Sequence, residues 1–184
     1  MLLLHDLAGY DGAPCALAMG VFDGMHIGHR RLILSAVRKA RSDGLKSVVL
    51  TYDRHPMAVF DPGHAPSMLM TNEEKIASIE KTGTDVLIML HFDMELASVP
   101  AEEYLAGICA YLHPAYIAVG FNHTFGRGGK GNAELLIRDQ EKYGYTALIL
   151  DKVEYGNECV SSTRIRRLLS EGKAEEAFKL MHED

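Results

Sequence analysis

The sequence predicts an α/β protein built on an open parallel sheet of five strands, with helices on both faces. Three observations lead to this fold class. Short β-rich or apolar runs alternate with segments of helical periodicity along the whole chain, which is the pattern of consecutive strand–helix units. One run is apolar almost throughout, as expected of a strand that is covered on both faces. Glycines, prolines and capping residues mark the ends of the segments.

The first strand–helix unit lies near the N-terminus. Cys15 to Phe22 is largely apolar and indicates a buried strand, and Gly28 to Ser42 has apolar residues at helical spacing. Gly44 is a typical helix terminator. A second β-rich run follows from Lys46 to Tyr52. Three prolines between Asp53 and Pro66 then indicate a long loop, and long loops in compact domains are often functional.

The rest of the chain continues the alternation. Thr71 and Glu74 have the spacing of a capping box, and Pro100 suits the first position of a helix. The elements predicted after the long loop are a helix from Thr71 to Thr82, a strand from Asp85 to Phe92, a helix from Pro100 to Leu112, a strand from Tyr116 to Gly120, a helix from Asn132 to Tyr143, a strand from Tyr145 to Leu150, a helix over Arg164 to Leu169 with hydroxyl caps before it, and a helix from Ala174 to Met181.

Length and charge restrict the function classes. The 184 residues suit one domain, which we expect to cover 1–184, and 47% hydrophobic with 24% charged residues is ordinary for a soluble protein. The net charge of −6 argues against broad nucleic-acid binding, which usually needs a basic face. A small basic pocket for a polyphosphate is compatible with this charge. The sequence does not predict the oligomeric state.

The cysteines and the apolar runs indicate the compartment. Cys15, Cys109 and Cys159 are odd in number and far apart, so they predict neither a zinc site nor a disulfide framework. The first residues lack the basic segment and apolar core of a signal peptide. No apolar run approaches the ~20 residues that span a membrane. We therefore expect a soluble, cytoplasmic protein with reduced thiols and no membrane partner.

The stretch from Gly20 to His29 is the strongest candidate for a chemical site. It lies where the first predicted strand ends and the first helix begins, and open α/β sheets bind ligands at such turns. A helix N-terminus offers free N–H groups to phosphate, and glycines allow a close backbone approach. His26 and His29 could donate hydrogen bonds to phosphate oxygens. The alternative is two surface histidines in a chain that has nine.

A second candidate group is Ser161-Ser162-Thr163, with Arg164 and Arg166 in the helix that follows. Helix capping alone explains hydroxyl side chains at this place. It does not require three of them in a row, nor basic residues in a first turn, where the helix dipole disfavours cations. A bound polyphosphate explains both features, because arginine can hold two phosphate oxygens at once.

Two further loops could hold a second substrate. Asp53, His55 and Pro56 follow the second strand, with a proline-fixed turn as the alternative interpretation. Asn122 and His123 leave the fourth strand between two phenylalanines that suit a planar ring, although phenylalanines are also ordinary core residues. The glycine-rich segment 126–131 could cover a nucleotide or be a mobile surface loop. It does not match the P-loop pattern.

The chain shows no recognisable nucleophile. No cysteine or serine has a histidine and a third orienting group at a known spacing, and no paired carboxylates recur. Such an inventory fits a reaction that depends on positioning and charge stabilisation, without a covalent intermediate. Phosphoryl or nucleotidyl transfer is of this type.

Taken together, the motifs resemble those of a known family. His26-Ile27-Gly28-His29 with Ser161 to Arg166 is similar to the paired H-x-G-H and S-S-T-x-x-R signatures of the nucleotidyltransferase superfamily. More narrowly, the chain from about Cys15 to Met181 resembles the FAD synthetase (FMN adenylyltransferase) module of bacterial bifunctional riboflavin kinase/FAD synthetases. Four motifs carry this resemblance in order: Gly20 to His26, Thr51 to Pro56, Gly120 to Gly126 and Val160 to Arg166.

The resemblance implies a Rossmann-like fold of the nucleotidyltransferase type and transfer of AMP from ATP to FMN, with Mg²⁺. The adenine would lie near Val119 and Gly120, and the FMN phosphate would attack in line, oriented by Asn122. The catalytic residues implied are His26, His29, Asn122 and Arg166. The ATP-binding residues implied are Gly20, Val21, Phe22, Asp23, Gly24, His26, Gly28, His29, Val119, Gly120, Ser161, Ser162, Thr163 and Arg166. The FMN-binding residues implied are Asp53, His55, Pro56, Asn122, His123, Thr124 and Phe125. The metal ligands are not predicted.

The chain departs from the family pattern in three respects. Arg54 stands where the family often has proline, and His123 stands where an aromatic such as phenylalanine is common. The riboflavin kinase module is expected to be absent, because the sequence ends at Asp184. Two alternatives stay open: a sister nucleotidyltransferase with another acceptor, such as phosphopantetheine or nicotinamide mononucleotide, and a flavin or nucleotide sensor that binds without turnover.

Overall fold

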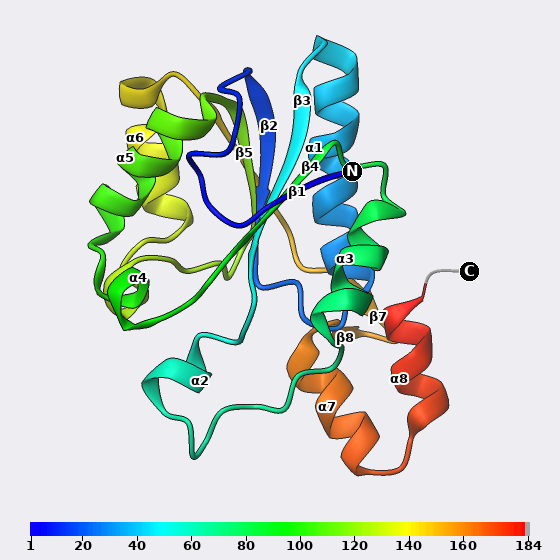
Figure 1. Cartoon of the computed structure of the whole chain (residues 1–184). Coiled ribbons are helices and arrows are strands. Elements are labelled where there is room, and N and C mark those ends of the chain that lie inside the picture. The colour runs from blue at the N-terminus through cyan, green and yellow to red at the C-terminus, as the bar shows by residue number, and fades with distance from the viewer. Residues whose placement is uncertain (183–184) are drawn as a thin grey trace.

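The computed structural model describes residues 1–182 and contains one open sheet of six strands, all parallel (Figure 1). The strand order is β1-β4-β3-β2-β5-β6. Five of the strands are the ones that the sequence predicts. The strands are β1 Leu2–Leu4, β2 Cys15–Met19, β3 Lys46–Tyr52, β4 Val86–Leu90, β5 Pro114–Gly120 and β6 Thr146–Leu150.

The prediction of five strands missed β1. This strand is only three residues long and pairs with β4 at the edge of the sheet, so it is too short to show a period in the sequence. A small antiparallel hairpin of β7 (Glu154–Tyr155) and β8 (Glu158–Cys159) was also not predicted. Its two-residue strands are again below the length at which alternation can be recognised.

Two layers of helices cover the sheet, as predicted. In Figure 1, α1 and α3 lie on one side of the sheet and α4, α5 and α6 on the other. Each layer packs on its own apolar cluster, because side chains of a strand point alternately to the two faces. The helices are α1 Ile27–Asp43, α2 Met57–Phe60, α3 Asn72–Glu80, α4 Met94–Ser98, α5 Ala101–Leu112, α6 Ala133–Tyr143, α7 Ser162–Ser170 and α8 Ala174–Met181.

Local details of the predicted elements differ in instructive ways. The capping box of Thr71 and Glu74 is present at the start of α3. The predicted strand ending at Phe22 ends at Met19 instead, because Phe22 has a left-handed backbone with φ 52°. Pro100 precedes α5 with an extended ψ of 147° and is therefore not its first residue. The predicted loop after β3 contains the one-turn helix α2.

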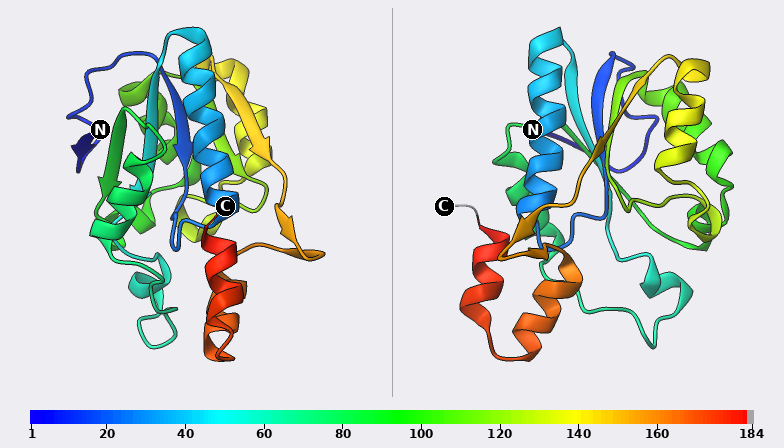
Figure 2. Two further views of the ribbon diagram at one scale, coloured as in Figure 1. Left: turned by 90° about the vertical axis from the view of Figure 1, so that its right-hand side faces the viewer. Right: turned by 180° about the vertical axis from the view of Figure 1, so that it is seen from behind.

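The last two helices lie together at one end of the sheet. Figure 2 shows α7 and α8 side by side below the start of α1. Ile27 and Val160 share a small apolar cluster with the buried faces of both helices, and the Arg30 side chain donates to the carbonyl of Met181 (3.4 Å). No helix within residues 1–182 has the length and apolar character needed to cross a membrane.

The strand order locates the ligand-binding edge of the sheet. From β2 the chain moves to β3 and β4 on one side of β2. It then returns to the other side of β2, where β5 and β6 are added. Parallel sheets open a crevice beyond the carboxyl ends of the two strands where this reversal occurs. The crevice here therefore lies after β2 and β5, at the end of the sheet where α7 is found.

Candidate active site

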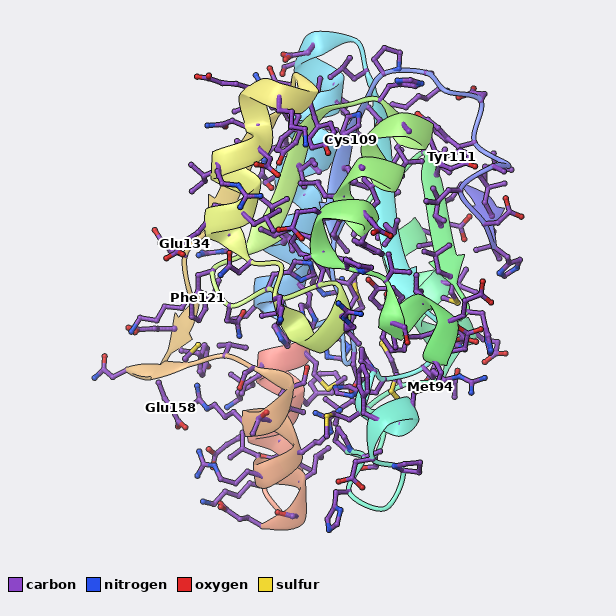
Figure 3. All side chains as sticks on the ribbon, turned by 90° about the vertical axis from the view of Figure 1, so that its left-hand side faces the viewer. Met94, Cys109, Tyr111, Phe121, Glu134 and Glu158 are labelled. Carbon is purple, nitrogen blue, oxygen red and sulfur yellow. The ribbon has the colours of Figure 1, made fainter. Side chains whose placement is uncertain are left out.

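A cavity of about 500 Å³ occupies this crevice. Its wall is formed by the segments that follow β2, β3, β5 and β6, together with the start of α7 and parts of α4 and α5. Figure 3 labels Phe121, which follows β5 and lines the cavity, and Met94, which begins α4 and is not in the cavity wall. The loops singled out from the sequence thus meet in one place.

The loop between β2 and α1 has an unusual backbone. Phe22 and Met25 are fully buried and have positive φ angles of 52° and 38°, which bulky residues rarely adopt. Gly24 between them has φ 80°, and a Cβ at this position would lie 2.8 Å from the side chain of Leu69. Strained backbone of this kind persists only where the surroundings enforce it, and it is frequent at functional sites.

His26 and His29 form a stacked pair at the start of α1. Their ring centroids are 3.6 Å apart, and His26 is the N-cap of the helix. The Nδ1 atom of His26 accepts the backbone N–H of His29 (3.3 Å). In the neutral ring the proton is therefore on Nε2, because only an unprotonated nitrogen can accept. His26 lines the cavity and thus has an N–H donor left for a ligand.

Both histidines are neutral in this environment. Burial lowers the pKa of His26 to about 4. The pKa of His29 lies well below its usual value because of burial, with smaller contributions from His26 and the positive charge of Lys75. The Nδ1 atom of His29 is buried and has no hydrogen-bond partner within residues 1–182. Such an orphaned polar atom in a cavity wall is a candidate ligand contact.

The start of α7 closes the opposite side of the same wall. Ser161 is the N-cap and accepts from the backbone N–H of Arg164 (3.2 Å), so ordinary capping accounts for this hydroxyl. The hydroxyl of Ser162 instead donates to the carbonyl of Asp23 (2.8 Å), which fixes α7 to the loop after β2. All three residues from 161 to 163 line the cavity.

Arg166 and Arg164 have different partners. The guanidinium of Arg166 forms an ion pair with the carboxylate of Asp23 and donates to the carbonyl of Ser67 (2.8 Å). Arg166 lines the cavity. Arg164 donates to the carbonyls of Tyr155 and Glu158 and stabilises the β7–β8 hairpin. Arg164 and Arg166 were both candidates to bind a polyphosphate, but only Arg166 is in the cavity wall.

The other half of the cavity is aromatic. Phe60, Phe92 and Phe125 line it with Tyr52 and Tyr104. His55, Pro56 and the segment Asn122 to Phe125, all predicted for the acceptor, are in the wall as well. Burial lowers the pKa of His123 to about 4, and burial with the nearby Arg166 charge also lowers that of His55. Tyr52 and Tyr104 were not predicted as site residues, because Tyr52 ends a β-rich run and Tyr104 follows two glutamates in a helix, and neither has a distinctive spacing.

Four residues predicted to bind substrates are not in the cavity wall. Val119 belongs to β5 and is fully buried in the apolar cluster on one face of the sheet, and Gly24 packs against Leu69. Asp23 is 2% exposed, and besides Arg166 its carboxylate accepts the backbone N–H of Leu69 (2.9 Å). Asp23 therefore joins three segments of the chain: the loop after β2, the 61–71 segment and α7.

Asp53 is the fourth of these residues. Its carboxylate contacts Nδ1 of His91 (2.6 Å) and accepts the backbone N–H of Phe92 (3.1 Å). Although burial raises the pKa of Asp53, these hydrogen bonds lower it overall. Asp53 therefore fixes the loop after β3 to the end of β4 and does not face the cavity. The 38-residue separation from His91 explains why no local sequence pattern indicated this contact.

Lys75 is a buried charge directly behind the site. It is 0% exposed, and its ammonium donates to the carbonyl of Tyr52 at the end of β3 (2.9 Å). Burial lowers the pKa of this ammonium, and the nearby carboxylates of Asp23 and Asp53 oppose that shift. The positive charge of Lys75 is thus compensated by Asp23 in the loop after β2 and Asp53 in the loop after β3. In the sequence Lys75 resembles any charged residue of an exposed helix.

The donor set at the cavity fits a metal that arrives with a phosphate ligand. Within residues 1–182 no three His, Cys, Asp or Glu side chains form a group that could hold a metal. Among these same residues 1–182, Asp151, directly after β6, is the one carboxylate in the cavity wall. Mg²⁺ commonly has one or two carboxylates and otherwise water and substrate phosphates as ligands, which this wall can accommodate.

Comparisons with known proteins identify the family of the chain. A sequence model of the FAD synthetase family matches residues 10–164. Relatives from Listeria monocytogenes, Bacillus subtilis and Escherichia coli, all named bifunctional riboflavin kinase/FMN adenylyltransferase, are 31%, 32% and 28% identical over 90%, 96% and 91% of this chain. The chain spans about half the length of these relatives, at 52%, 56% and 54%.

Solved structures support the same fold. The crystal structure of a protein named macrolide-efflux protein from Streptococcus pneumoniae matches 98% of this chain and 59% of its own, with a TM-score of 0.84 and 29% identity. A pantoate-beta-alanine ligase from Francisella tularensis, with a TM-score of 0.52 and 12% identity over 98% of this chain and 86% of its own, shares the fold alone. The family match covers most of the sequence and all of the loops around the cavity. The chain therefore belongs to the FAD synthetase family.

Proposed function

We propose that this chain is an FMN adenylyltransferase, which transfers AMP from ATP to FMN and gives FAD and pyrophosphate. One observation carries the proposal. A single cavity has the starts of two helices, a histidine pair and an arginine in one part of its wall and a cluster of aromatic rings in another. This division suits a polyphosphate beside a planar ring system.

The phosphates of ATP belong at the starts of α1 and α7. Gly28, His29 and Ser161 to Thr163 bring the N-terminal ends of both helices into the cavity wall, and such ends attract anions. The orphaned Nδ1 of His29 and the free Nε2–H of His26 supply further contacts. Gly20 to Phe22 and Gly120 complete the nucleotide side.

FMN belongs in the aromatic half. His55 and Pro56 lie in one of its walls, and Asn122 to Phe125 in another. The side-chain amide of Asn122 would orient the FMN phosphate toward ATP. Thr124 and the neutral His123 offer hydrogen bonds without placing a charge beside the apolar ring.

The proposed reaction is a single in-line displacement. An oxygen of the FMN phosphate forms a bond to the α-phosphorus of ATP, and the bond from that phosphorus to the bridging oxygen of pyrophosphate breaks. His26, His29 and Arg166 stabilise the charge that develops on the leaving oxygens. The FMN phosphate is already ionised near neutral pH, so no general base is required.

Mg²⁺ would be held largely by the triphosphate, with Asp151 as the available carboxylate. When bound, it supplies positive charge that neutralises the leaving pyrophosphate. The chain's own residues position both substrates and keep water away from the reacting phosphorus.

The alternatives are a sister enzyme with another phosphorylated acceptor and a sensor that binds without turnover. The family match does not favour either of them. The residues whose loss would indicate a sensor are all present, namely His29, Ser162, Thr163 and Arg166.

The test is to incubate the protein with ATP, Mg²⁺ and either FMN or riboflavin, and to separate the flavin products. We expect FAD from FMN and no FMN from riboflavin. Adenylylation of phosphopantetheine or nicotinamide mononucleotide without any FAD would contradict the proposed acceptor.

A further inference from the structure

Two tyrosine hydroxyls form an isolated hydrogen-bonded pair in the aromatic half of the cavity. The hydroxyl oxygens of Tyr52 and Tyr104 are 2.7 Å apart. Tyr52 is the last residue of β3, and Tyr104 is in α5. Both side chains line the cavity, with 6% and 7% of each residue exposed. They are not among the residues predicted from the sequence.

The surroundings of the pair are apolar. The ring of Phe92 meets that of Tyr52 edge-on with centroids 5.0 Å apart, and Phe125 lies 5.7 Å from Tyr104. The ammonium of Lys75 contacts Tyr52, but it binds the backbone carbonyl and not the hydroxyl. Within residues 1–182 each of the two hydroxyls has only the other as a hydrogen-bond partner.

A count of hydrogens shows that the pair is unsatisfied. Two phenolic hydroxyls carry two hydrogens, and the bond between them uses one. Burial raises the pKa of both tyrosines, so both hydrogens are present at neutral pH. One O–H group is therefore left without an acceptor among residues 1–182, and a ligand in the cavity could supply the missing partner.

We propose that the Tyr52–Tyr104 pair is a specificity element that donates its spare O–H to an acceptor atom on the ring edge of the acceptor substrate. This inference rests on the proposed function, which makes that ring the isoalloxazine of FMN. The ring has carbonyl oxygens and unprotonated nitrogens on its edge, and its apolar faces suit the neighbouring phenylalanines. A phosphate would not be expected here, because the helix starts and Arg166 belong to the other part of the wall.

The experiment compares Tyr52→Phe, Tyr104→Phe and the double variant with the wild type. The steady-state KM for FMN and for ATP, kcat and the melting temperature are measured for each protein. Tyr145→Phe is the matched control, because its hydroxyl is also buried and donates to the carbonyl of Leu136 (2.7 Å), away from the cavity.

We expect the double variant to raise the KM for FMN about tenfold, as for loss of one hydrogen bond to a neutral acceptor. The KM for ATP should stay within about twofold of the wild type, because the pair is remote from the phosphate side. One single variant should account for most of this loss. The control should lower the melting temperature at most, with both KM values unchanged.

An unchanged KM for FMN in a folded double variant would overturn the inference. If the double variant does not fold, two folded single variants with an unchanged KM for FMN would overturn it equally. Failure of the proposed function is a different result, since the wild type itself would then form no FAD. In that case FMN binding, followed by quenching of its fluorescence, replaces KM as the readout for the same variants.

Discussion

The two sides of the cavity are built in different ways. The phosphate side, which comprises residues 20–29 and 161–166, depends on helix starts, strained backbone and an ion pair between Asp23 and Arg166. The ring side, which comprises Tyr52, Phe92, Tyr104 and Phe125, consists of packed aromatic rings with one hydroxyl pair. Charge stabilisation and acceptor recognition are thereby assigned to separate walls, and variants on one side should leave the other side's substrate largely unaffected.

The largest effect is expected on the phosphate side, from Asp23→Ala. This change leaves the partly buried guanidinium of Arg166 without its carboxylate and Leu69 without its acceptor. Removing one partner of a buried ion pair lowers the free energy of unfolding by about 3 kcal/mol. Denaturant unfolding of the variant measures this loss.

Glu154→Ala is the control for this variant. Glu154 pairs with Lys152 (2.7 Å), but both side chains are about half exposed. Exposed pairs contribute roughly 0–1 kcal/mol, so the control should unfold nearly as the wild type does. A loss of stability in Asp23→Ala no larger than in this control would show that Asp23 does not hold the phosphate side together.

His29→Ala tests the chemistry of the same side. The change removes a hydrogen-bond donor that is proposed to act on the transition state, so kcat should fall at least ~10²-fold. The KM for FMN should be nearly unchanged. Steady-state kinetics with each substrate varied in turn separates these outcomes, and His5→Ala, which is outside the cavity wall, is the control. Loss of FMN affinity with an intact kcat would instead place His29 on the ring side.

A pH-dependent effect is common to both sides, since each has a histidine whose pKa is lowered by burial. The pKa of His26 and of His123 is lowered to about 4 by burial, whereas both titrate near 6.5 when unfolded. Above pH 6.5 neither state binds a proton there, so stability does not depend on pH through these groups. Between pH 6.5 and 4 the unfolded state binds more protons, and stability falls by about 3 kcal/mol for each histidine.

Unfolding free energies at several pH values check this expectation. His123→Gln should reduce the loss of stability between pH 6.5 and 4.5, because a glutamine does not bind a proton. An equal pH dependence in the variant and the wild type would mean that His123 is not held neutral. The comparison is restricted to this range because carboxylates begin to titrate below it.

Sequence and structure agree most closely where the chemistry follows strand ends. His26, His29, Asn122 and Ser162 were found because they come directly after predicted strands or before predicted helices, and parallel strands bring such positions together. Asp151 could have been found by the same rule, since it follows β6 directly.

The remaining features depend on contacts that are distant in sequence. Asp53 faces His91 and Phe92 and not the cavity, which no local pattern indicates. Lys75 follows two glutamates in a helix, as a solvent-exposed lysine often does, yet it is buried and donates to the carbonyl of Tyr52 at the end of β3. Tyr52 and Tyr104 contribute to an apolar core, so their hydroxyls gave no signal until the two rings were seen to meet.

The separation of the two walls is tested most directly by kinetics of His29→Ala beside the Tyr52→Phe/Tyr104→Phe double variant, with FMN, ATP and Mg²⁺. We expect the histidine variant to lose kcat at least ~10²-fold with the KM for FMN retained. The tyrosine variant should show the reverse, a KM for FMN raised about tenfold with kcat retained. If kcat and the KM for FMN instead changed together in both variants, the assignment of chemistry and acceptor recognition to separate walls would be wrong.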